Sequence, residues 1–183
     1  MNEVKRMYKV FLSPSAQEFN PYLTGGNEEY YMNLLADEIE RILRLNGIQT
    51  ARNDPSEDFN GAIDRSNEDD YDLHIALHSN ASPPNMSGRM QGPVIFFYPD
   101  SEKSICISER IGEGFEKIYP DPGKVAVLPS YTLAELRRTK APAVFAEVAY
   151  HDNAQDERWI KQNIPLIASE IAAAIIKYLN SEC

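Results

Sequence analysis

Short apolar runs alternate along this chain with longer segments whose apolar positions recur at helical spacing. A strand buried on both faces is a nearly continuous apolar run, so these runs predict strands. They lie at residues 8–13, 48–52, 71–78, 92–99 and 142–150, with a shorter one at 125–128.

The clearest predicted helix covers residues 27–47. Asn27 is a good N-cap and Gly47 a good stop. Its apolar positions recur every three or four residues, as on one face of a helix: Tyr31, Leu34, Leu35, Ile39, Ile42 and Leu43. Further helices are expected at 56–69, 101–119, 154–163 and 165–180, and residues 132–139 are expected to form a short helix or an irregular segment.

Strands that alternate with helices indicate an α/β fold. We therefore expect a three-layer sandwich with a largely parallel central sheet flanked by helices. The 183 residues contain no repeat, low-complexity tract or linker, so residues 1–183 are expected to form a single domain.

The composition excludes some classes of function. The net charge is −10 and the pI about 4.8, which argues against nucleic acid as a partner, because phosphate binding needs clustered Lys and Arg. No apolar run approaches the roughly 20 residues of a membrane span, and no signal-peptide core is seen. Cys106 and Cys183 form no disulfide framework, so both are expected to be free thiols.

Chemically active side chains follow the predicted strands. In open α/β sheets the active site lies beyond the carboxyl ends of the strands. His78 ends one strand, Glu147 lies in the last, and Glu29 begins the first helix at the same sheet edge. Histidine and carboxylate ligands with a separate Glu as base are the composition of a hydrolytic zinc site.

Glu29 and Glu147 are not equally strong evidence for a zinc site. Glu29 lies in a first helical turn, where the helix dipole alone favours a carboxylate. Glu147 interrupts the apolar run "PAVFAEVAY", and a buried carboxylate is costly unless it pairs with a charge or a metal. Glu147 therefore indicates a function more strongly than Glu29 does.

The other two histidines need separate interpretations. His74 is four residues before His78 on the same strand face, which places them roughly 13 Å apart. They cannot ligate one ion, so His74 is expected in the core or as support behind the site. His151 follows the last strand and is a candidate ligand, acid catalyst or surface residue.

Three segments, "GGNEEYYMNLL", "DLHIALHSNA" and "APAVFAEVAYHDN", resemble in order and spacing the motifs of the zinc-dependent N-acetylmuramoyl-L-alanine amidases of the amidase-3 family. The resemblance spans roughly residues 8–180. It implies hydrolysis of the amide between N-acetylmuramic acid and L-alanine in peptidoglycan. By the same resemblance, Glu29 and His78 are zinc ligands and Glu147 is the catalytic carboxylate.

The first strand departs from the family pattern. Family members usually have a Gly-His pair there, whose His is a zinc ligand, but this chain reads "LSPSAQEFN". It resembles a branch of the family with a Ser-Pro-Ser-x-Gln start. We hypothesise that His151 replaces the missing ligand. Gln17 or Ser13 as an oxygen ligand, and a degenerate metal site, stay open as alternatives.

Peptidoglycan or a muropeptide is thus the expected partner. A non-catalytic binding module is the main alternative function, and a serine hydrolase using Ser13 or Ser15 is disfavoured because no Gly flanks either Ser. We expect cytoplasmic synthesis, with action at the cell wall after phage-type release or sporulation, or on cytoplasmic fragments. The sequence does not predict an oligomeric state.

Overall fold

The sheet of the computed structural model, which describes residues 7–180, has six strands. The strand order is β2-β1-β3-β6-β4-β5, and only the β4–β6 pair is antiparallel. The predicted α/β class with a largely parallel sheet is confirmed. The strands are β1 (Lys9–Pro14), β2 (Gln49–Arg52), β3 (Leu73–Asn80), β4 (Val94–Phe97), β5 (Ala126–Pro129) and β6 (Ala143–Tyr150).

The helices agree closely with those predicted. They are α1 (Glu28–Leu45), α2 (Phe59–Glu68), α3 (Glu102–Ile118), α4 (Ala134–Arg138) and α5 (Ala154–Asn180), with 3₁₀ turns at Pro84–Met86 and Pro122–Lys124. Asn27 caps α1 by accepting the backbone N–H of Tyr30 at 2.8 Å. The two predicted C-terminal helices meet at Asn163, whose backbone is not helical, two residues before Pro165.

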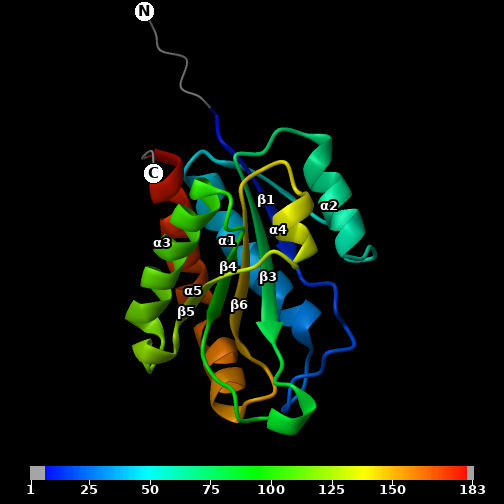
Figure 1. Cartoon of the computed structure of the whole chain (residues 1–183), viewed down its shortest axis with the longest axis vertical. Coiled ribbons are helices and arrows are strands. Elements are labelled where there is room, and N and C mark those ends of the chain that lie inside the picture. The colour runs from blue at the N-terminus through cyan, green and yellow to red at the C-terminus, as the bar shows by residue number, and fades with distance from the viewer. Residues whose placement is uncertain (1–6, 181–183) are drawn as a thin grey trace, which may run out of the picture.

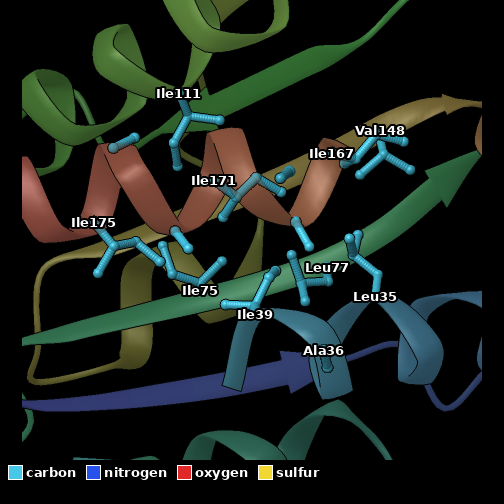
Figure 2. Packing of buried hydrophobic residues seen from close by; sticks show 14 of the residues in the cluster. Leu35, Ala36, Ile39, Ile75, Leu77, Ile111, Val148, Ile167, Ile171 and Ile175 are labelled. Atoms are coloured by element: carbon cyan, nitrogen blue, oxygen red, sulfur yellow. The ribbon is translucent and has the colours of Figure 1, made fainter. Parts of the chain in front are cut away.

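Two unequal layers cover the sheet (Figure 1). On one side lie α1, α3 and α5, and on the other lie only the short α2 and α4. Figure 2 shows the side covered by α1, α3 and α5, hereafter the thick side, where Ile167, Ile171 and Ile175 of α5 and Ile39 of α1 belong to one cluster with Ile75 of β3. This packing forms the main hydrophobic core.

The opposite side, covered by α2 and α4 and hereafter the thin side, holds a much smaller apolar cluster. Ala76, Leu136, Ala143 and Phe145 form it. The short α2 and α4 leave part of the sheet's face unfilled, and the polar side chains described below lie on this face. The main hydrophobic core therefore lies on the thick side of the sheet, and the polar candidate site residues lie on the thin side.

No helix within residues 7–180 is long and apolar enough to cross a membrane. The expectation of a free thiol at Cys106 is wrong, because that residue is disulfide-bonded; spacing along a sequence does not show which sulfur atoms meet in the fold. Cys183 lies outside the described residues.

Candidate active site

The alternation of side chains along β3 decides which residues face the thin side. Successive side chains of a strand point to opposite faces. Leu73, Ile75 and Leu77 join the main core, so His74 and His78 point to the other face. Neighbouring β6 behaves in the same way: Val144, Ala146 and Val148 enter the main core, and Glu147 lies opposite them.

His78 is held between carboxylates of two helices. Its Nδ1 lies 2.8 Å from Glu28 Oε1, and its Nε2 lies 3.7 Å from Glu135 Oε1. Its ring stacks on Phe145 with centroids 4.3 Å apart. Burial lowers the pKa of His78, but the carboxylates of Glu135 and Glu28 outweigh it and raise that pKa to about 10. The imidazole is therefore protonated at neutral pH without a metal.

The carboxylate that contacts His78 belongs to Glu28, one residue before the predicted Glu29. Glu28 is buried, and it also accepts from Asn20 Nδ2 at 2.6 Å. Burial raises its pKa, yet the hydrogen bond and charge of His78 hold that pKa below its usual value. Adjacent helical residues point about 100° apart, so Glu29 faces elsewhere; it lines a cavity together with His78. The ligand role of Glu29 stays a prediction.

Glu147 lies beside His78, because the two residues are register partners of β6 and β3. Its Oε2 is hidden from solvent and has no hydrogen-bond partner. Burial raises the pKa of Glu147 to about 7; the charge of His78 opposes this rise, and that of Glu28 adds to it. A carboxylate with such a pKa can take and return a proton near neutral pH, as a general base must.

His151 lies behind Ser79, the residue after His78. Its Nδ1 is 2.9 Å from the carbonyl oxygen of Ser79, and its ring stacks on Tyr22. A carbonyl oxygen only accepts, so Nδ1 carries the proton and Nε2 keeps its lone pair when the ring is neutral. This tautomer leaves Nε2 available as an acceptor or ligand. His151 is not among the residues that line the cavity.

Sequence reasoning missed Glu135, which joins the two histidines of β3. Its Oε2 lies 2.8 Å from His74 Nε2, and His74 Nδ1 lies 2.9 Å from Ser66 Oγ. All three side chains are buried. His74 therefore supports the site from behind, as one of its two interpretations predicted. The only signal for Glu135 was a carboxylate beside Leu136 in a short predicted helix, which is too common a pattern to single it out.

We expect Glu135→Gln to lower the free energy of unfolding by about 3 kcal/mol at pH 7, because it removes one partner of a buried ion pair. Burial raises the pKa of Glu135, but His74 and His78 lower it to about 2. A lowered pKa stabilises the fold above the ordinary value of 4.5, and this stabilisation is lost as the pH falls towards 2. Urea unfolding between pH 2 and 7 measures both effects.

The matched control is Glu38→Gln, which removes an exposed carboxylate paired with Arg41. We expect it to cost less than about 1 kcal/mol. An equal loss in the two variants would contradict a special role for the buried pair.

A cavity of about 830 Å³ opens above His78 on the thin side of the sheet. Most of its lining residues belong to the segment after β1 and the segment before α2, and His78 and Glu135 also line it. Ser13, Ser15 and Gln17, which the sequence placed at the end of the first strand, all line it. The predicted sheet edge therefore gathers Glu29, His78 and these residues around one space, with Glu147 adjacent to His78.

These residues form no complete metal site by themselves. Within residues 7–180, no three His, Cys, Asp or Glu side chains gather closely enough to hold a metal ion. Glu28 and His78 are two adjacent donors of the type zinc uses. The structure thus pairs two donors of the kind that bind metal ions, and it does not bring His151 into that pair.

A sequence model of the family described as N-acetylmuramoyl-L-alanine amidase matches residues 19–177. No curated protein sequence matches the chain.

Solved structures share the fold at low sequence identity. The N-acetylmuramoyl-L-alanine amidase AmiC2 of Nostoc punctiforme superposes with a TM-score of 0.83 at 16% identity, covering 95% of this chain and 98% of that one. The catalytic domain of the amidase CwlV from Bacillus (Paenibacillus) polymyxa var. colistinus gives 0.82 at 17%, covering 95% and 99%. The catalytic domain of the CD27L endolysin, which targets Clostridia difficile, gives 0.75 at 22%, covering 94% and 98%.

Proposed function

The chain belongs to the amidase-3 family of N-acetylmuramoyl-L-alanine amidases, and from this membership we propose a zinc-dependent hydrolysis of the amide between N-acetylmuramic acid and L-alanine in peptidoglycan. One observation supports assigning this reaction to particular residues. His78 and Glu28 lie in contact beside Glu147, whose Oε2 is buried without a partner and whose pKa is raised to about 7.

The donor set supports a zinc ion at His78 and Glu28. Histidine ligands of zinc commonly turn their second ring nitrogen towards a carboxylate, which fixes the orientation of the ring. In His78 this second nitrogen would be Nε2, which faces Glu135, so that Nδ1, next to Glu28, would be the nitrogen that binds zinc. Because His78 is protonated without a metal, zinc binding would displace a proton and depend on pH.

His151 is our proposal for the third ligand. Ligating histidines also often donate one ring N–H to a backbone carbonyl, and His151 Nδ1 makes this bond to Ser79, next to His78. The alternatives, Gln17 and Ser13, both line the cavity beside His78. Oxygen ligands of this neutral kind suit zinc less well than imidazole does.

The residues divide the reaction between them. A zinc ion at this site would polarise the scissile carbonyl and lower the pKa of an attacking water. Glu147 takes a proton from that water as its oxygen bonds to the carbonyl carbon, and returns the proton to the leaving nitrogen as the C–N bond breaks. The products are the free lactyl carboxyl group and the amino group of L-alanine.

The test of the function joins metal analysis of the purified protein with mass spectrometry of digested peptidoglycan. We expect about one zinc per chain, and fragments split between sugar and peptide whose release stops with a chelator. Protein that binds zinc yet leaves this amide intact contradicts the function. Cleavage of the amide with no dependence on metal contradicts the zinc mechanism alone.

A zinc titration tests the ligand role of His151. We expect His151→Ala to weaken zinc binding at least tenfold, because one of three protein ligands is lost. Tyr22→Leu is the matched control, since it removes the ring stacked on His151 and leaves the imidazole. Unchanged zinc affinity in His151→Ala would rule the residue out and direct attention to Gln17 and Ser13.

A non-catalytic binding module is the second candidate. The observation that favours it is the lack of a three-residue metal cluster within residues 7–180. Such a module would bind peptidoglycan and show neither zinc nor cleavage in the same experiment.

A further inference from the structure

The cavity above His78 has features that the proposed reaction does not use. Most of its lining residues lie within 13–19 and 53–59, on the β1–β2 side of His78. Glu147 lies on the opposite side, on β6. A substrate whose scissile bond lies at His78 and Glu147 would therefore place one of its two halves in this cavity.

Two exposed aromatic rings border the cavity. Phe19 is 75% exposed and Phe59 is 51% exposed, and both line the cavity, from two separate segments of the chain. A single exposed aromatic residue is common, but here two of them line one cavity that His78 also lines: Phe19 in the segment after β1 and Phe59 at the start of α2. The negative face of an aromatic ring attracts polarised C–H groups, such as those on the flat face of a pyranose sugar.

The charges around the cavity disfavour the peptide half of the substrate. The described lining residues include no Lys or Arg, and five of them are acidic: Glu18, Glu29, Glu57, Asp58 and Glu135. The peptide stem carries free carboxylates, and like charges placed together repel each other. The muramic acid side is uncharged, because its lactyl carboxyl group is tied into the scissile amide.

Asn53, which also lines the cavity, has a hydrogen-bond acceptor without a partner. Its Nδ2 donates to the carbonyl oxygen of Pro14 at 3.1 Å, which fixes the orientation of the amide. Its Oδ1 is buried and has no hydrogen-bond partner. A buried acceptor without a partner is costly, and the N–H of an acetamido group is a donor that would satisfy it.

We infer that this cavity binds an N-acetylated sugar on the glycan side of the scissile bond, with Phe19 and Phe59 against the sugar face and Asn53 Oδ1 accepting from its acetamido group. The inference rests on the proposed function for the identity of the substrate. The stem peptide then lies on the β6 side of His78. This assigns a substrate-binding role to Phe19, Asn53 and Phe59, for which the sequence patterns suggested none.

The experiment measures binding of a peptide-free N-acetylglucosamine–N-acetylmuramic acid disaccharide by calorimetry or NMR titration. We expect the double variant Phe19→Ala, Phe59→Ala to lose at least tenfold in affinity for the disaccharide. It should also raise the KM for a muropeptide more than it lowers kcat. Tyr131→Ala is the matched control, because Tyr131 is 57% exposed and lies outside the cavity lining.

Asn53 is tested with cellobiose, which has hydroxyl groups in place of acetamido groups. Wild-type protein should prefer the N-acetylated disaccharide to cellobiose, and Asn53→Ala should lose that preference.

The outcomes separate this inference from the proposed function. Disaccharide binding that depends on the two Phe residues supports the sugar site, even in protein that cleaves no amide. Amide cleavage combined with no disaccharide binding, or with binding that the double variant leaves unchanged, overturns it. Loss of affinity for the free stem peptide in the double variant, with the disaccharide unaffected, would assign the cavity to the peptide and also overturn it.

Discussion

Glu147→Gln is expected to lower kcat for amide hydrolysis by at least about 100-fold, the usual scale for loss of a general base. Gln has nearly the same shape but cannot take a proton. Since the pKa of Glu147 is raised to about 7, wild-type activity should also fall as the pH drops below 7. A pH–rate profile on a soluble muropeptide measures both effects.

The same substitution should leave the fold intact. Burial disfavours the charged form of Glu147, so its raised pKa reduces stability progressively as the pH rises from about 4.5 through about 7. Gln carries no charge, so the variant should be as stable as the wild type at pH 5 and at least as stable at pH 8. A near wild-type rate in Glu147→Gln would refute its role as the base.

Glu28→Gln and Glu29→Gln form a matched pair of variants. They compare the ligand proposed from the structure, Glu28, with the ligand implied by the family motif, Glu29. The two residues are adjacent, have the same chemistry and begin the same helix, but only Glu28 contacts His78. We expect Glu28→Gln to weaken zinc binding at least about tenfold, since a neutral amide is a poorer zinc ligand than a carboxylate. Glu29→Gln should leave zinc affinity within about twofold.

Zinc titration against a competing chelator, at one pH and with thermal unfolding as a check, measures this difference. The reverse result, with zinc lost in Glu29→Gln and kept in Glu28→Gln, would support the predicted ligand role of Glu29 instead. Equal zinc affinity in both variants would exclude a carboxylate ligand from this helix.

Local patterns were sufficient for most of the fold. Helical spacing and end signals predicted α1, with Asn27 as its cap, because these effects act within a few residues. Apolar runs predicted every strand of the sheet. The alternation in "LHIALHSN" also already assigned His74 and His78 to one face, opposite Leu73, Ile75 and Leu77.

The site was predictable only in outline. Strand ends indicated His78 and Glu147 as neighbours, and they are register partners in the sheet. Whether Glu28 or Glu29 contacts His78 depends on the rotation of α1 about its own axis. Adjacent residues differ by about 100° in direction, and the packing of α1 on the sheet fixes this rotation. A periodic pattern marks the buried face of a helix but does not decide which of two adjacent carboxylates at its end turns inward.

The sequence by itself thus determined the α/β class, the order of the elements and the sheet edge where the chemistry lies, because each depends on local propensity and periodicity. Only the tertiary structure decided that Glu135 of the short α4 contacts His74 and faces His78, and that two separate segments of the chain line a cavity with His78. These contacts join residues about 60 positions apart in the chain. Side chains so distant meet only through the packing of whole helices and loops on the sheet, and no local pattern encodes that packing.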